Sequence, residues 1–214
     1  MNALHPLLQN HSLRLGIQHA INYEKVNSGL HRGDLRRIRS FADGYGPYTH
    51  KTLKAREFDP QKAEAYFAEA GFTQRGDDGV LVDASGQRLS FPLTISNSTN
   101  EVTIATILKE EAMIAGLELN LDVLDPTAFI TKTFEKNHEL ALHGWDTGYS
   151  PLPAFEWELR GVDAGNPSNF NTTNIKDEQL DSVLAEWDRN GEVDRAIKLS
   201  HEAQELSLIH ISEP

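Results

Sequence analysis

The sequence contains no cysteine among its 214 residues. This absence excludes a disulfide framework, a thiol nucleophile and a thiolate metal site, and it leaves the redox compartment open. Long apolar runs are absent as well, because no stretch approaches the roughly 20 apolar residues that cross a bilayer. We therefore expect a soluble protein that forms one domain or one large lobe.

Positive charge is scarce in this chain. Lys and Arg total 20 against 32 Asp and Glu, which gives a net charge of −12 at pH 7. Such a charge repels phosphate backbones, so nucleic acid is not expected as a partner. The one basic cluster, Arg32, Arg36, Arg37 and Arg39, lies in a polar segment and is interpreted as a solvated surface rather than an anion site.

Several familiar motifs are also missing. The first 15 residues lack the charged head and apolar core of a signal peptide, so either the protein is cytosolic or its true beginning is missing. No G-x-S-x-G turn, P-loop or G-x-G-x-x-G occurs. His138 and His143 stand in a strand-like run on opposite faces, so no metal site is predicted. We expect no cofactor.

The apolar patterns that are present predict an α/β fold. Alternating apolar residues predict strands at 88–95, 117–123 and 138–143, and helical spacing predicts helices that start at Thr99 and Pro126. This β-α-β-α-β order implies right-handed crossovers and a mixed, partly parallel sheet with flanking helices. Other predicted elements are helices near 13–26, 60–70, 180–187 and 193–203, and a long irregular connection at 27–57.

Two finer predictions concern the sheet and its core. A glycine turn at 84–86 predicts that the strand at 88–95 pairs with residues 80–83 as a hairpin, and Pro92 predicts an edge strand or a bulge. The apolar faces predict a shared core, which includes Phe67, Leu108, Leu119, Phe134 and Leu140.

The stretch from His138 to Pro153 carries the candidate binding residues. An apolar run ends at Gly144, and a turn-rich loop with Trp145, Asp146 and Tyr149 follows. In open α/β sheets, ligands lie just beyond the carboxyl ends of strands. Flat aromatic rings and one carboxylate suit binding better than turnover, although the same residues also fit a loop that merely caps the core.

Several separated segments share the pattern of one protein family. The most specific runs from Phe58-Asp59-Pro60 through Glu69-Ala70-Gly71-Phe72. The others are Leu13–Asn22, Ala115–Leu119, His143-Gly144-Trp145, and Asn169 with Ile175–Asp181. Over about residues 10–205 the chain resembles the C-terminal part of the family 5 extracellular solute-binding proteins of ABC importers, the peptide- and nickel-binding group. The run from Trp145 to Trp157 is more similar to the oligopeptide and microcin-uptake branch.

The resemblance implies a particular fold and division of the chain. The fold would be one periplasmic-binding-protein-like (type II) lobe of a two-lobe clamp, with most of the first lobe outside this chain. Residues 1–57 would then be a partial helix and an irregular lobe-crossing segment, and residues 58–205 the α/β second lobe. Residues 206–214 look like a translated sequencing-adaptor remnant and are expected to be a non-native tail.

The resemblance also implies a function. The protein would be a periplasmic or extracytoplasmic monomer that delivers a peptide or another small polar solute to an ABC permease, without covalent chemistry. Trp145 and Tyr149 would supply flat contacts, and Asp146 and Asn169 hydrogen bonds. In peptide-binding members, an acid three residues after the Gly-Trp tryptophan holds the peptide amino group. Here Gly148 occupies that position and Asp146 is the nearest acid.

Two alternatives stay open from the sequence. One is a small α/β hydrolase- or lyase-type enzyme, in which Asp146 and Glu156 serve as a carboxylate pair. The other is a truncated gene product with no function.

Overall fold

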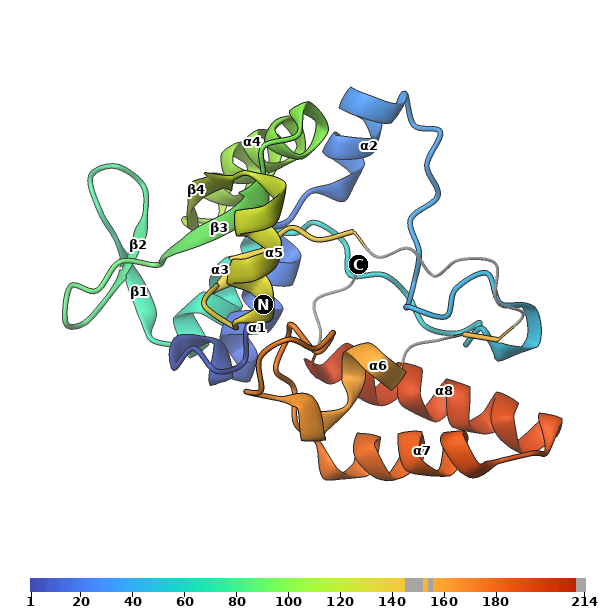
Figure 1. Cartoon of the computed structure of the whole chain (residues 1–214). Helices are drawn as coiled ribbons and strands as arrows, with labels where there is room; N and C mark the ends of the chain where they lie inside the picture. Colours follow the sequence, from blue (N-terminus) through green and yellow to red (C-terminus); the bar gives the residue numbers. More distant parts are fainter. Residues whose placement is uncertain (145–151, 154–155, 211–214) are drawn as a thin grey trace.

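The computed structural model describes residues 1–144, 152–153 and 156–210 of the chain (Figure 1). Ahead of the strands lie η1 (Leu7–Gln9), α1 (His11–Ala20), α2 (Tyr23–His31), η2 (Gly46–Tyr48) and α3 (Pro60–Glu69). The strands and the helices between them are β1 (Phe72–Arg75), β2 (Leu81–Asp83), β3 (Ser90–Ser96), α4 (Thr99–Ile114), β4 (Glu118–Leu124), α5 (Pro126–Phe134) and β5 (Leu140–Ala141). After them come α6 (Glu156–Leu159), η3 (Gly161–Asp163), α7 (Glu178–Arg189) and α8 (Val193–His210).

The helices α3, α4 and α5 begin at the predicted residues because each has a side-chain cap. Asp59 accepts a hydrogen bond from the Lys62 amide at 3.0 Å, and Pro60 occupies the first helical position. Asp125 repeats this arrangement ahead of Pro126, and Ser98 caps α4. These caps satisfy amide groups that have no partner within the helix.

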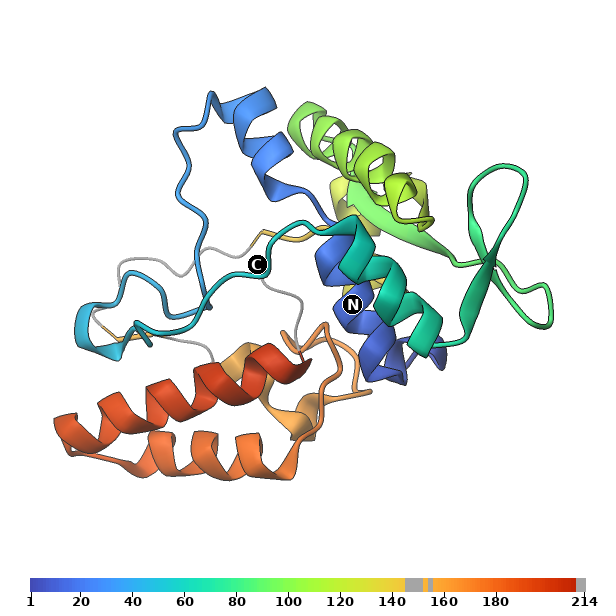
Figure 2. The ribbon, with the colours of Figure 1, turned by 180° about the vertical axis from the view of Figure 1, so that it is seen from behind.

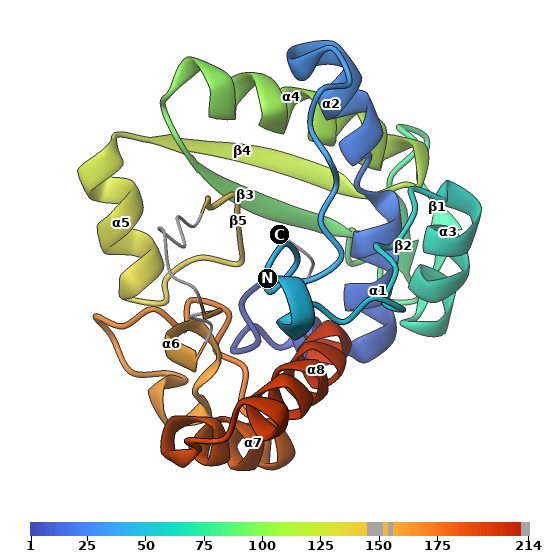
Figure 3. The same cartoon turned by 90° about the vertical axis from the view of Figure 1, so that its right-hand side faces the viewer.

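The main sheet has the strand order β4-β3-β5, and both pairings are parallel (Figure 3). Leu93 lies opposite Leu121 of β4 and opposite Leu140 of β5. The three strands predicted to lie side by side therefore do so, and the α/β fold class is confirmed. Within the sheet, β4 lies on one side of β3, and β5, the next strand in the sequence, lies on the other side. With right-handed crossovers, this reversal places α4 and α5 on opposite faces of the sheet.

The face toward α5 is polar as well as packed. Asp122 of β4 accepts hydrogen bonds from Thr94 Oγ1 at 2.9 Å and from Lys132 Nζ at 2.8 Å, and Lys132 belongs to α5. The Lys132 ammonium beside it is the main cause that lowers the pKa of Asp122. A charged pair thus fixes α5 on its strand.

The hairpin prediction is confirmed only next to its turn. Val82 forms an antiparallel bridge with Arg88 just before β3, and the Leu89 amide donates to the Leu81 carbonyl at 2.7 Å. The main partner of β2 is β1, which pairs with it antiparallel and was not predicted. Pro92 lies in the central strand and not in an edge strand. It is tolerated because β5 begins opposite Leu93, so β3 has no named strand on that side at Pro92.

The helix predicted at 13–26 is two helices. It is interrupted after Ala20, because Asn22 leaves the helical conformation and caps α2 through a hydrogen bond from the Lys25 amide at 3.0 Å. The second helix ends at His31, and Arg32 follows it as the C-cap with a positive φ of 56°.

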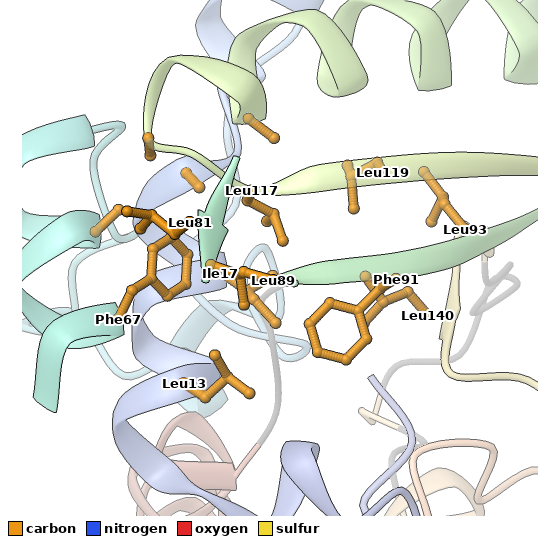
Figure 4. Close-up of a cluster of buried hydrophobic side chains, with 14 of the residues drawn as sticks. Leu13, Ile17, Phe67, Leu81, Leu89, Phe91, Leu93, Leu117, Leu119 and Leu140 are labelled. Carbon is orange, nitrogen blue, oxygen red and sulfur yellow. The ribbon is translucent and has the colours of Figure 1, made fainter. Parts of the chain in front are cut away.

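The largest core lies between α1, α3 and the sheet (Figure 4). Phe67, Leu119 and Leu140 are buried there as predicted, and Leu108 is buried too. Phe134 is an exception, since it is only half-buried and packs edge-on against Phe170 at 5.7 Å between ring centroids. Helix α3 lies against α1 and β1 rather than directly on the main sheet.

A smaller core joins α7 and α8, which form a hairpin apart from the sheet (Figure 2). Gln204 of α8 is fully buried and fastens this hairpin to the segment before α3. Its Oε1 accepts from Ser40 Oγ at 2.6 Å, and its Nε2 donates to the Tyr48 carbonyl at 2.7 Å. Helix α8 continues through Ser207, which is buried, so the assignment of 206–214 as a non-native tail stays a prediction. No helix in the described ranges is long and apolar enough to span a bilayer.

We expect Phe67→Ala to lower the free energy of unfolding by about 3–5 kcal/mol, because it leaves a cavity between α3 and α1. The control is Gln61→Ala on the exposed side of the same helix, which should change it by less than about 0.5 kcal/mol. Urea denaturation of both variants measures the difference. Equal midpoints for Phe67→Ala and the native chain would contradict the assignment of this core.

Candidate functional site

A cavity of about 80 Å³ opens between the main sheet and the helices α1, α2 and α4. Its floor is apolar, because the sheet contributes Leu93, Leu119, Leu140 and Leu142 and α1 contributes Ile17. These side chains share the sheet face opposite to Thr94, in accordance with the alternation of a strand. The cavity lies next to β5 and is bordered by Leu142, directly beyond the carboxyl end of that strand.

The polar side chains that line this cavity belong to two arginines, a tyrosine and Gln18 of α1. Arg37 and Arg56 both come from the irregular segment between α2 and α3, and Tyr23 is the first residue of α2. The Arg37 guanidinium lies over the Tyr23 ring, with Cζ 4.6 Å from the ring centroid. Arg56 Nη2 donates to the Leu208 carbonyl at 3.2 Å, which ties this segment to α8.

The neighbouring arginines have a different role. Arg39 and Arg36 converge on Asp43, whose side chain is only 2% exposed, with N–O distances of 2.9 Å from each. Hydrogen bonds, first from Arg39 and then from Arg36, hold the pKa of Asp43 at about 2 against the opposing effect of burial. The solvated-surface interpretation therefore fits the exposed Arg32 and Arg36 but was wrong for Arg37, which is half-buried at the cavity.

The predicted loop begins where the cavity ends. Trp145, Asp146 and Tyr149 lie outside the described residues, so their roles stay predictions. The strand that leads to them is shorter than predicted, since only Leu140–Ala141 pairs with β3. The order of the strands reverses around β3, and ligands of open α/β sheets lie beyond the carboxyl ends at such a reversal.

Asn169 is described, and its side chain is engaged inside the protein. Its Oδ1 accepts from Lys136 Nζ at 2.8 Å and from the Asn171 amide at 3.1 Å. Its Nδ2 donates to the carbonyls of Asn166 and Asp163 at 2.7 and 2.9 Å. The geometry makes Asn169 the anchor of its loop, and a direct contact with a ligand stays a prediction.

The histidines of the region are buried or packed against aromatic rings. Burial is the main cause that lowers the pKa of His138 to about 4, so its ring is neutral at pH 7. His143 lies 5.3 Å from the Phe129 ring, measured between centroids. Within the described ranges, no three His, Asp or Glu side chains are grouped as metal ligands would be.

Sequence reasoning missed Arg37 and Arg56 as residues of the site. One signal was present, because both lie in the long irregular connection, and such connections are often functional in compact domains. The apolar floor had a clearer signal, because Leu119 and Leu140 were already assigned to the sheet face. Nothing in the local sequence indicates that Arg37 differs from Arg36 beside it.

A parallel sheet flanked by helices, with a cavity beside its strand ends, is the arrangement expected of a solute-binding lobe. The sequence profile of the bacterial extracellular solute-binding proteins, family 5 Middle, matches residues 1–167. The chain belongs to this family. Its members are binding proteins of ABC transporters and not enzymes, so the hydrolase or lyase alternative is not supported.

Two curated relatives are longer than this chain. A probable ABC transporter-binding protein of Deinococcus radiodurans is 37% identical over 130 residues, which are 55% of this chain and 22% of the relative. The oligopeptide-binding protein AppA of Bacillus subtilis is 26% identical over 146 residues, 66% of this chain and 23% of AppA. The regions that match this chain thus make up less than a quarter of the length of each relative.

Solved structures share the fold at low sequence identity. AppA in complex with a nonapeptide superposes with a TM-score of 0.86 at 17% identity, over 99% of this chain and 42% of AppA. NikZ of Campylobacter jejuni in complex with Ni(L-His) gives a TM-score of 0.85 at 19% identity, again over 99% and 42%. The periplasmic-binding-protein-like fold of the lobe is thereby confirmed.

We expect Asp43→Asn to lower the free energy of unfolding at pH 7 by about 2 kcal/mol, because the ionised carboxylate is paired in the folded state. The pKa of Asp43 is lowered from 3.8 to about 2, so this stability is present above pH 4 and is lost as the pH falls toward 2. Urea denaturation at both pH values tests it, with the exposed Asp34→Asn as control. An Asp43→Asn deficit that stays constant down to pH 2 would contradict the paired carboxylate.

Proposed function

We propose that this chain is the solute-contacting lobe of a substrate-binding protein that delivers a peptide-like solute to an ABC permease. The whole protein would act outside the cytoplasmic membrane as a monomer. Closure of a second lobe over the bound solute would complete the site. The observation that carries the proposal is the cavity at the carboxyl end of β5. Leu142 borders this cavity, and Gly144 and Trp145 follow it closely in the sequence.

The residues of the loop are suited to such a solute. Trp145 and Tyr149 offer flat rings that pack on side chains or on peptide planes, and Asp146 offers a carboxylate for an amine or amide. Gly148 stands where peptide-binding relatives have an acid, so Asp146 is the nearest carboxylate to that position. Asn169 would support the site indirectly, because its hydrogen bond from Lys136 Nζ holds its own loop in place.

A peptide-like solute is favoured by the mixture of surfaces at the site. The apolar floor suits a side chain, and the arginines at its border can donate hydrogen bonds to oxygens of the solute. AppA, whose solved structure contains a nonapeptide, has a matching fold and is also a curated relative. NikZ, which shares the fold as well, was solved with a nickel complex, so a metal complex is the rival solute.

We expect the chain to bind short mixed-sequence peptides weakly, with a Kd near or above about 1 mM, because one lobe supplies half of the contacts while most of the association entropy is still lost. Trp145→Ala should weaken this binding at least about tenfold, since a buried aromatic contact is a common hot spot. Amide chemical shifts of ¹⁵N-labelled protein, titrated with tripeptide mixtures, measure both affinities.

The control for this experiment is Trp187→Phe. Trp187 belongs to α7 and packs edge-on against Tyr48 at 6.1 Å, away from the sheet, so its replacement should leave the affinity unchanged. Two results would contradict the proposal: no shift changes with any peptide, or an affinity of Trp145→Ala equal to that of the native chain. Binding of Ni(L-His) with no peptide binding would favour the rival solute instead.

A further inference from the structure

The turn between α7 and α8 contains Asn190-Gly191, the only place in the sequence where glycine follows asparagine. This turn lies at the end of the hairpin that is farthest from the main sheet (Figures 1 and 2). Gly191 and Glu192 are exposed, and Asn190 is half-buried. Solvent therefore reaches the peptide link between Asn190 and Gly191.

The backbone nitrogen of Gly191 is accessible as a nucleophile. It belongs to neither helix, because α7 ends at Arg189 and α8 begins at Val193. Among the described residues, none accepts a hydrogen bond from the Gly191 amide. A helical amide would first have to break its hydrogen bond before it could react, and this one does not. No side chain crowds the nitrogen either, since glycine has none and a Cβ built at this position would meet no atom within 4 Å.

The Asn190 side chain is folded over the same peptide link. Its Nδ2 donates to the Glu192 carbonyl at 2.7 Å, and its Oδ1 accepts from the Glu192 amide at 3.3 Å. Both hydrogen bonds reach two residues forward in the sequence, so the side-chain amide spans the Gly191 peptide. The Glu192 N–H also points at the oxygen on which negative charge develops when a nucleophile attacks Cγ, and such a donor stabilises that charge.

We propose that Asn190 is a modification site that deamidates spontaneously through a cyclic imide with Gly191, and that the product weakens the α7–α8 turn. The Gly191 nitrogen gives its proton to hydroxide and bonds to Cγ of Asn190. The bond from Cγ to Nδ2 breaks, and the amine takes a proton from water and leaves as ammonia. Water then opens the imide at one of its two carbonyl carbons. Opening at Cγ gives aspartate, and opening at the main-chain carbon gives isoaspartate, so the net reaction consumes one water and releases one ammonia.

Either product disturbs the contacts that hold the turn. In aspartate an anionic oxygen takes the place of the Nδ2 donor, 2.7 Å from the Glu192 carbonyl oxygen, so two acceptors face each other. The same carbonyl accepts from the Ala196 amide at 2.9 Å at the start of α8, so the disturbance reaches this helix. The new charge also lies at the C-terminal end of α7, where the helix dipole disfavours an anion. Isoaspartate adds one carbon to the main chain between the two helices.

The test follows the native chain, Gly191→Ala and a synthetic peptide of residues 186–195 during incubation at mildly alkaline pH. Peptide mapping by mass spectrometry measures the conversion of each asparagine to the acid. Asn100 and Asn120 are internal controls, because both are exposed but precede glutamate and leucine. We expect Asn190 to convert first, and Gly191→Ala to slow its conversion at least about tenfold, because the added Cβ crowds the attacking nitrogen. This variant should fold, since the Cβ meets no neighbouring atom within 4 Å.

A second measurement tests the effect on the turn. Amide hydrogen exchange of Asn190→Asp should be faster at 189–196 than in the native chain and unchanged in β4. Unchanged exchange at 189–196 would overturn the weakening of the turn.

Three results would overturn the modification site itself. Asn100 or Asn120 could convert as fast as Asn190, or Gly191→Ala could react at the native rate, which would exclude the cyclic imide. The folded chain could also react more than about a hundredfold more slowly than the peptide, which would show that the folded turn protects Asn190.

Discussion

The close contact between α1 and α3 is the constraint on which the arrangement of this lobe depends. A methyl group at Gly16 would lie 2.5 Å from Cε1 of Phe67, so only glycine lets the two helices approach this closely. This approach places Leu13 and Ile17 of α1 in the same core as Phe67. The Asp59 amide donates to the His19 carbonyl at 2.9 Å. This hydrogen bond holds the start of α3 against the end of α1, after the long irregular segment that separates them in the sequence.

The irregular segment between α2 and α3 becomes part of the site because both of its ends are fixed. Residues 32–57 leave from α2 and come back at α3, and between them the buried Gln204 holds the segment against α8. Asp43 forms ion pairs with Arg36 and Arg39. Arg37, between them in the sequence, instead places its guanidinium over the Tyr23 ring at the cavity. A segment without regular structure thus acquires defined side-chain positions from three packed helices.

Much of the sheet could be predicted from the sequence because its signals are local. Asp59-Pro60 and Asp125-Pro126 determine helix starts through caps that involve only neighbouring residues, and the alternation at 117–123 defines the face of β4. The cavity role of Arg37 depends on residues that are distant in sequence, among them Leu93, Leu119 and Leu140 of the sheet. Such a role is determined by packing, so no local pattern indicates it. The Asn22 cap, in contrast, is a local signal that the sequence prediction did not use.

The central claim is that the end of β5 and the crossing segment form one solute surface. Amide hydrogen exchange of the chain, with and without a short mixed-sequence peptide at a concentration above its Kd, tests it directly. The account predicts slower exchange in both 140–144 and the two arginine segments, 35–39 and 54–58, with no change at the far end of the α7–α8 hairpin near 189–193. Protection of only one of these regions, or protection confined to the hairpin, would contradict it.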